Sequence, residues 1–295
     1  MKVSNKLEKT RNMITLIVII LATICCIAPI ISKGEILQTS MTSAYGEEIT
    51  LYGKGLYARN SFSMATQAIA QDMVTLLLAV PCMMISLYFV KKKRTWAQFV
   101  LTGLLAYMLY TYMSYTFLMF YDDLFLVYVI NMALSFYGFV ISINLLLKNE
   151  IAEKLQKNMR TKSLQIFLVI TGIIITLLWS GRIIPTIGND HAPVGLDNYS
   201  TLVIQGLDLG IIVPVCFVIS YLLKEKNKLG YILGPVIIIK AVTLVLAVLA
   251  MALYLCLSGE AVAPVEYISF GCICVFAVYF LVRILKQIQE IDKSK

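Results

Sequence analysis

The sequence predicts an all-α, polytopic membrane protein with eight transmembrane helices and both termini in the cytoplasm. Apolar residues make up 59% of the 295 residues and charged residues only 14%, whereas soluble domains carry about 25% charged residues. The apolar residues are gathered into long runs, each near the roughly 20 residues that a helix needs to cross a bilayer. Basic residues cluster in every second connection between the runs, which places those connections in the cytoplasm.

Eight apolar runs are the predicted transmembrane helices. They are Met13–Ser32, Asp72–Val90, Trp96–Phe120, Leu124–Leu147, Leu164–Pro185, Thr201–Leu223, Leu229–Leu255 and Val265–Leu285. The first run is long for a signal peptide and lacks a small-x-small cleavage pattern, so it is predicted to remain as a helix. The whole chain, 1–295, is predicted to form a single integral membrane domain.

The basic residues determine the predicted orientation. They gather before the first run, after the second, between the fourth and fifth, after the sixth and at the end of the chain, whereas the alternate connections contain only Lys33, Lys54 and Arg59. The positive-inside rule therefore assigns the first set of connections to the cytoplasm. The net charge of +8 is a topology signal, and no nucleic-acid partner is predicted.

Two connections carry signals of further structure. The long outer segment Lys33–Gln71 contains glycine-rich turns and then an alanine-rich stretch, which predicts a short helix beginning near Met64 and leading into the second span. The cytoplasmic segment Lys148–Lys162 has apolar residues at helical spacing, among them Ile151 and Leu155. This pattern predicts an amphipathic helix lying at the membrane surface.

The second and sixth spans resemble each other. Both have a polar outer start and a central proline: Gln71, Asp72 and Pro81 in the second span, and Gln205, Asp208 and Pro214 in the sixth. Because the two spans run in the same direction, they suggest a parallel repeat of four helices with halves 1–148 and 149–295, as transporters often have. Alternatively, the shared pattern is a general feature of helices that start at the outer face.

Lys240 is the most informative single residue, because it lies in the middle of the apolar run Leu229–Leu255. A lysine near the centre of a membrane helix costs about 2.5–3.5 kcal/mol on insertion scales. Asp208, on the preceding antiparallel span, falls at a similar depth, and consecutive helices usually touch. The sequence therefore predicts an Asp208–Lys240 pair. It is either part of a substrate or ion site, or a permanent ion pair that fixes the helix register.

Further polar residues fall near the same depth and are predicted to converge on a polar cavity open to the outer face. The candidate substrate- or ion-binding residues are Lys240, Asp208, Gln205, Asp72, Gln71, Tyr110, Asn131 and Arg182. Each has a structural alternative. A tyrosine such as Tyr110 fills a core, Asp72 is near enough to the interface to be solvated there, and Arg182 with Asp190 anchors a helix end at the interface.

The sequence contains no motif of an enzyme, a metal site or a cofactor site. It has no HExxH, GxSxG, P-loop or Rossmann glycine pattern. The seven cysteines lie within apolar runs without CxxC spacing, and a single histidine excludes a bis-histidine haem site within the chain. No cofactor is therefore identified, and the sequence does not favour an enzyme.

A wider pattern extends over Leu51–Tyr57, Ser63, Gln67, Gln71, Asp72, Leu76–Pro81 and Gly234–Met251. It resembles a family of uncharacterised multi-pass integral membrane proteins of bacteria, and the similarity covers most of the chain. The resemblance implies no activity and no ligand. The chain is predicted to lie in the plasma membrane of a bacterium.

The predicted function is transport or sensing of a small molecule or ion through the outward-facing cavity, in a protein whose main partner is the lipid bilayer. Two alternatives from other classes stay open. One is a membrane-embedded enzyme that acts on a lipid or quinone. The other is a non-catalytic subunit of a membrane complex, in which the polar residues only hold helices together.

Overall fold

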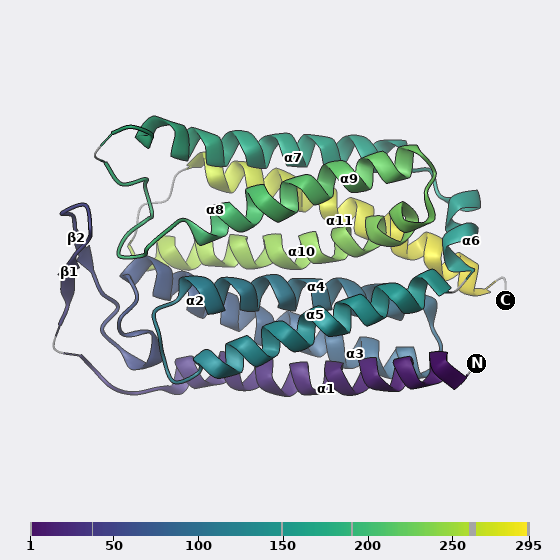
Figure 1. The fold of residues 1–295 in the computed structure, drawn as a ribbon, viewed down its shortest axis with the longest axis horizontal. Helices are drawn as coiled ribbons and strands as arrows, with labels where there is room; N and C mark the ends of the chain where they lie inside the picture. Colours follow the sequence, from purple (N-terminus) through teal and green to yellow (C-terminus); the bar gives the residue numbers. More distant parts are fainter. Residues whose placement is uncertain (1, 37, 149, 190, 260–263, 294–295) are drawn as a thin grey trace.

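The computed structural model describes residues 2–36, 38–148, 150–189, 191–259 and 264–293. These residues form an elongated bundle of long helices with a small β-hairpin at one end (Figure 1). Helix α1 (Lys2–Ile31) begins at the opposite end of the bundle, and helix α11 (Pro264–Lys293) ends there.

Between these two helices, long helices follow one another along the bundle axis. The uninterrupted ones are α4 (Thr95–Leu118), α5 (Phe125–Lys148), α7 (Lys162–Ile183) and α10 (Lys228–Leu257). Two spans are built in two parts, α2 (Phe62–Val74) with α3 (Val80–Lys91), and α8 (Val203–Leu207) with α9 (Val213–Lys224). The short elements are the antiparallel strands β1 (Ser40–Thr42) and β2 (Glu48–Thr50), helix α6 (Ile151–Asn158), and 3-10 turns at Gly55–Tyr57 and Ile184–Thr186.

Seven helices within the described residues are long and apolar enough to cross a membrane. They are Asn5–Ile31, Phe62–Lys91, Phe125–Lys148, Lys162–Thr186, Val203–Lys224, Lys228–Leu257 and Ile268–Glu290. This supports the predicted class, a helical multi-pass membrane protein, to which the structure adds the small hairpin. Helix α4 has a similar length of 24 residues, but its tyrosines, threonines and serines lower its hydropathy, and most of its residues are buried.

Each two-part span contains a proline just after a π-helical turn. The turns cover Thr75–Ala79 and Asp208–Ile212, and Pro81 and Pro214 follow them at the same distance. Proline lacks a backbone N–H and its ring clashes with the carbonyl four residues earlier, so the helix widens before the proline instead of breaking. The second wide turn begins at Asp208 itself and thereby sets the direction of that carboxylate.

The similarity of the two spans continues beyond the prolines. The same number of residues separates every pair of corresponding positions. In both cases a helix ends at a lysine, a lysine with positive φ follows, and the next helix begins: Lys91, Lys93 and Thr95 in the first case, and Lys224, Lys226 and Lys228 in the second. At this offset Thr75 corresponds to Asp208, and Tyr107 corresponds to Lys240. Thr75 and Tyr107 share a hydrogen bond of 2.7 Å between their hydroxyl groups.

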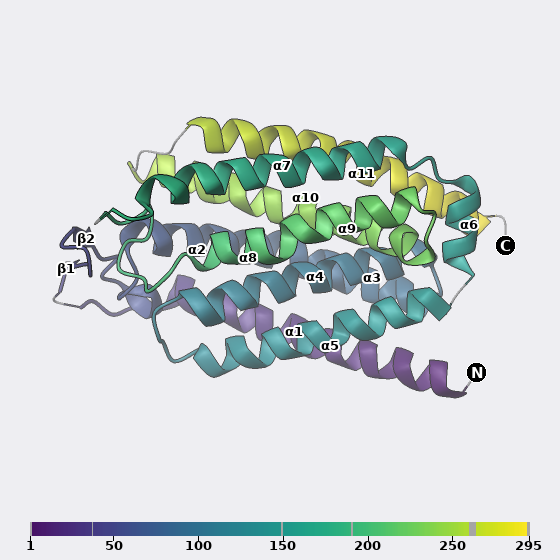
Figure 2. The ribbon, with the colours of Figure 1, turned by 45° about the horizontal axis from the view of Figure 1, so that its top comes forward.

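The long helices form two groups that meet at α4 and α10. Figures 1 and 2 both place α1 and α5 on one side of the bundle and α7 and α11 on the other. Helices α4 and α10 come very close at Gly103, where a Cβ atom would overlap the side chain of Ile239. The largest apolar core lies within the first group and reaches α10 through Ala247.

Two local predictions need correction. The helix expected near Met64 is not a separate element, because α2 starts at Phe62 and continues through the wide turn into α3. Ser61 caps this start by accepting a hydrogen bond of 3.2 Å from the backbone N–H of Met64. The predicted amphipathic helix exists as α6, but Ile151 and Leu155 are buried against the bundle helices, because those helices offer an apolar surface there.

Candidate functional site

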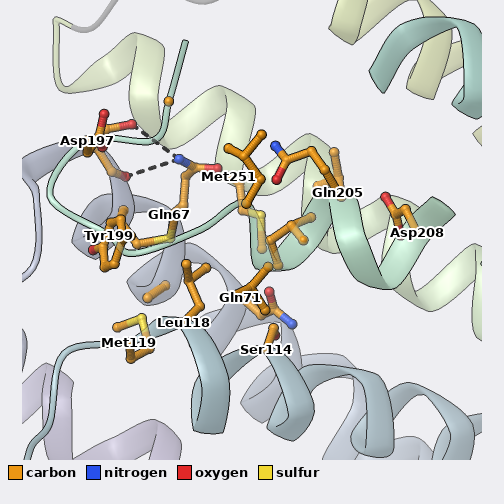
Figure 3. A pocket seen from close by; sticks show the side chains of 18 of the residues that line it. Gln67, Gln71, Ser114, Leu118, Met119, Asp197, Tyr199, Gln205, Asp208 and Met251 are labelled. Carbon is orange, nitrogen blue, oxygen red and sulfur yellow. Dashed lines mark hydrogen bonds between the residues drawn. The ribbon is translucent and has the colours of Figure 1, made fainter. Parts of the chain in front are cut away.

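A cavity of about 490 Å³ lies between the two groups of helices, at the end of the bundle that carries the β-hairpin (Figure 3). Its walls come from α2 and α4 on one side and from α7, α8 and α10 on the other. The segment Val194–Leu202 borders it toward the hairpin. This position, between two helix groups and lined by residues distant in sequence, is typical of ligand sites in helical bundles.

Asp208 forms the inner end of this cavity. Only 7% of the residue is exposed. Its Oδ1 accepts a hydrogen bond of 2.7 Å from the Tyr110 hydroxyl, and its Oδ2 accepts one of 2.9 Å from the Trp179 indole N–H. These donors reduce the cost of burying a carboxylate, and each oxygen keeps a lone pair that a ligand can use.

Lys240 lies behind this inner end and does not line the large cavity. It is 3% exposed, and its Nζ lies 4.1 Å from the centre of the Tyr110 ring, in a cation–π contact. Within the described residues it forms no hydrogen bond or salt bridge. The predicted pairing of Asp208 with Lys240 is therefore indirect, because Tyr110 contacts both.

A second, smaller cavity of about 50 Å³ is lined by both Asp208 and Lys240. Thr171 also lines it, and the Thr171 hydroxyl is buried without a hydrogen-bond partner in the described part of the chain. A chamber of this size with polar groups has room for water. Asp208 lines both cavities, so its carboxylate lies between the large cavity and the buried ammonium.

Two predicted glutamines line the large cavity from opposite sides. Gln205, on α8, is 7% exposed, and its side-chain amide has no hydrogen-bond partner among the described residues. Figure 3 shows this amide directed toward Met251 and the space between the helix groups. Gln71, on α2, donates from Nε2 to the Thr111 hydroxyl at 2.8 Å. The Gln205 amide therefore faces the cavity with its donors and acceptor unused by the described residues, so a ligand can bond to it.

Hydrogen bonds connect two loop segments at the hairpin end of the cavity. The Ser61 hydroxyl donates to Asp197 Oδ2 at 2.7 Å, and the backbone N–H of Ser61 donates to the Tyr199 hydroxyl at 3.3 Å. The Tyr199 hydroxyl in turn donates to Asn60 Oδ1 at 3.0 Å. Burial, reinforced by the charge of Asp197, raises the pKa of Tyr199 above its usual value. This hydroxyl therefore stays a neutral donor. We call these four residues the outer contact.

The other predicted candidates are divided between the cavity and the surrounding core. Arg182 lines the cavity, with its guanidinium 5.3 Å from the centre of the Trp179 ring. Asp190, its predicted neighbour at the interface, lies outside the described residues. Asp72 lines neither cavity. The alternative of a solvated Asp72 is wrong, because the residue is 1% exposed and accepts hydrogen bonds from Tyr57 and Tyr115 at 2.8 and 2.9 Å.

Asn131 also lies away from both cavities. It is fully buried on α5, and neither atom of its amide has a hydrogen-bond partner among the described residues. The sequence predicted Asn131 as a cavity residue because Tyr128, Asn131 and Ser135 lie on one face of the same helix. That face packs within the first helix group instead, and nothing in the structure explains the unpaired amide.

The sequence analysis missed several groups that line the cavity, among them Trp179, Asp197 and Tyr199. Trp179 precedes the candidate Arg182 by almost one helical turn, so the spacing could have indicated a shared face. Asp197 and Tyr199 lie in a connection without regular structure, where no periodicity indicates which side chains face inward. Within the described residues, no group of three His, Cys, Asp or Glu side chains is placed to hold a metal ion.

Comparisons with known proteins give no identification. No protein-family model, no curated protein and no solved structure matches the chain. The function is therefore argued from the geometry and chemistry of the site itself.

Proposed function

We propose that this protein is a transporter that binds a small molecule in the large cavity. The observation that carries the proposal is the cavity of about 490 Å³ between the two helix groups, with the unpartnered amide of Gln205 and the buried carboxylate of Asp208 in its wall. Its volume is in the range of small-molecule sites. Two spans widened by a proline border it, and transporter sites are often formed by such discontinuous helices.

The proposal includes eight transmembrane helices, with α4 as the eighth. At about 1.5 Å per residue, 24 residues reach roughly 36 Å, enough to cross the hydrocarbon core. The neighbouring helices cover most of α4, so its hydroxyl groups need not face lipid. The distribution of basic residues favours cytoplasmic termini in a bacterial plasma membrane, and the cavity then opens toward the outer face.

We further propose that the two helix groups are parallel repeats, 1–148 and 149–295. The support is the constant offset that relates the two wide turns, the two prolines and the starts of α4 and α10. On this proposal the neutral pair Thr75–Tyr107 is the counterpart of the charged residues Asp208 and Lys240. The first half then stabilises the bundle, and the second half carries the charge needed to recognise a ligand.

A ligand screen tests the cavity as a binding site. The purified full chain is mixed with separate sets of amines, carboxylates, sugars and nucleosides, and its thermal unfolding is followed. Ligands of the cavity are expected to raise the unfolding temperature of the wild type and to lose this effect in Gln205→Leu. The matched control is Gln165→Leu on α7, outside both cavities, which is expected to keep the effect.

Uptake of a ligand found in this way separates transport from sensing. The full chain is reconstituted in liposomes, and accumulation of the labelled ligand is compared with that in empty liposomes. Transport predicts protein-dependent uptake that Gln205→Leu abolishes. Binding without uptake would indicate a sensor. Stabilisation that persists unchanged in Gln205→Leu would show that the ligands bind elsewhere, and the proposal would be wrong.

A further inference from the structure

The inner end of the large cavity offers hydrogen-bond acceptors and few free donors. The donors of Tyr110 and Trp179 are both used on Asp208. The Ser114 hydroxyl donates to a backbone carbonyl of its own helix at 2.7 Å, and the Gln71 amide nitrogen donates to a hydroxyl on α4. Unused lone pairs remain on the Asp208 carboxylate, on the Gln71 side-chain carbonyl and on Ser114 Oγ. The Gln205 amide, one helical turn from Asp208, is the exception, because its N–H groups have no partner among the described residues. Beside the Asp208 carboxylate itself, a ligand group must donate hydrogen bonds.

The charged groups of the cavity have the same bias. Asp208 at the inner end and Asp197 near the outer contact are both carboxylates. Arg182 is the one cation among the described lining residues, and its guanidinium lies against the Trp179 ring. Lys240 is kept out of the cavity behind Tyr110. This balance favours a positively charged ligand group over a negatively charged one.

The remaining wall is apolar and adaptable. Met64, Met119 and Met251 line it from three different segments, together with Leu244 and Phe270. Methionine side chains are flexible and polarizable, so they fit irregular apolar shapes and make favourable contacts with aromatic rings. The wall therefore suits a hydrocarbon body and does not suit a sugar or another ligand with polar groups on all sides.

We propose that the cavity binds an organic ammonium ion, a protonated amine attached to an apolar body. The N–H groups of the ammonium donate to Asp208 and to the side-chain carbonyl of Gln205 one helical turn away, next to the aromatic rings of Tyr110 and Trp179. The apolar body lies along the methionine-lined wall. This inference names the substrate class of the site proposed above, and its link to transport rests on that proposed function.

Lys240 has a defined part in this arrangement. Its ammonium contacts the ring of Tyr110, whose hydroxyl donates to Asp208, and Lys240 and Asp208 line the same small cavity. A ligand ammonium that reaches Asp208 from the large cavity competes with Lys240 for the same negative charge. Removing the lysine charge is therefore expected to strengthen the binding of an amine and to leave the binding of an uncharged analogue unchanged.

The test uses Trp179 as a fluorescent reporter. Trp96 is the only other tryptophan, so the full chain with Trp96→Phe reports on the cavity alone. 3-Phenylpropylamine, 3-phenylpropanol and 4-phenylbutanoate have the same phenylpropyl body and differ in the head group, which is cationic, neutral or anionic at neutral pH. The amine is expected to bind about tenfold or more tighter than the alcohol, and the carboxylate is expected to bind weakest.

Variants of the reporter protein assign this preference to Asp208. Asp208→Asn is expected to reduce the preference for the amine over the alcohol by about tenfold. The control Asp72→Asn changes a buried acid outside the cavity and is expected to keep the preference. Lys240→Met is expected to strengthen amine binding only. If Asp208→Asn does not fold, the comparison of head groups on the unchanged cavity still decides the question.

The outcomes separate this inference from the proposed function. Binding of all three probes with equal affinity, or tightest binding of 4-phenylbutanoate, overturns the ammonium proposal and leaves the cavity as a small-molecule site. A preference for the amine that survives Asp208→Asn overturns the role of that carboxylate. Failure of every probe to change Trp179 fluorescence, together with a failed ligand screen, overturns both proposals.

Discussion

Tyr110 is the residue that links the two charged groups predicted from the sequence. Its hydroxyl donates to Asp208 at 2.7 Å, and its ring lies 4.1 Å from Lys240 Nζ. The buried acid and the buried base therefore stabilise each other without direct contact. A permanent structural pair would be expected to form a short salt bridge, because burial of separate charges costs more free energy. An indirect pair leaves the carboxylate available to a ligand.

A double-mutant cycle measures how strongly these two charges depend on each other. Lys240→Met and Asp208→Leu are each expected to lower the free energy of unfolding, by about 3–5 kcal/mol, because each leaves an uncompensated buried charge. The double variant is expected to lose at least 0.5 kcal/mol less than the sum of the two losses. Denaturation in detergent measures all four proteins. Strict additivity would show that the two residues do not interact.

At the scale of single elements, small residues and prolines decide how the helices meet. Pro81 and Pro214 each follow a wide turn, and the second turn begins at the carboxylate of the site. Gly103 lets α4 approach α10 so closely that no side chain fits between them. Close approach at glycine is a common way for membrane helices to gain packing energy. The two walls of the cavity are thus held together at this glycine.

Two glycine substitutions test this packing. Gly103→Ala places a methyl group inside the Ile239 side chain and is expected to lower the free energy of unfolding by about 1–3 kcal/mol through overpacking. Gly181→Ala, on α7, meets no atom within 4 Å and is expected to be neutral, or to stabilise the helix by up to about 1 kcal/mol. Equal unfolding temperatures for the two variants would contradict the close contact.

For the whole molecule, the outer contact joins segments that belong to different helix groups. Asn60 and Ser61 precede α2, whereas Asp197 and Tyr199 lie between α7 and α8. Their hydrogen bonds lie next to the hairpin end of the cavity. A transporter must open such a contact to admit its substrate and close it again, and segments held by a few hydrogen bonds open at a small free-energy cost.

Weakening the outer contact is expected to open the cavity to solvent. In the Trp96→Phe protein, Tyr199→Phe removes two hydrogen bonds of the contact, worth about 1 kcal/mol each, and leaves the Ser61 cap of α2 in place. Quenching of Trp179 fluorescence by acrylamide is expected to increase, because the cavity is exposed more often. The control Ser40→Ala removes an exposed hydrogen bond to Glu48 in the hairpin and is expected to leave quenching unchanged. Equal quenching in both variants would exclude a gating role for the contact.

The sequence by itself determined the membrane class and the long apolar helices, and it predicted several residues that line the cavity, among them Asp208, Gln205 and Arg182. These features depend on hydropathy and on charge within one segment, which are local properties of the chain. The resemblance between the two proline-containing spans was also predicted from the sequence. The alignment of their residues depends on the positions of the two wide turns, which only the structure shows.

Only the tertiary structure decided which polar groups share a cavity. It placed Tyr110 between the two charges, moved Asp72 and Asn131 into the core, and brought Trp179 to the carboxylate. These contacts join helices far apart in the chain, and a helix rotation of one residue, about 100°, changes which face a side chain occupies. Periodicity within one helix gives no information on such contacts, because they depend on how its neighbours pack against it.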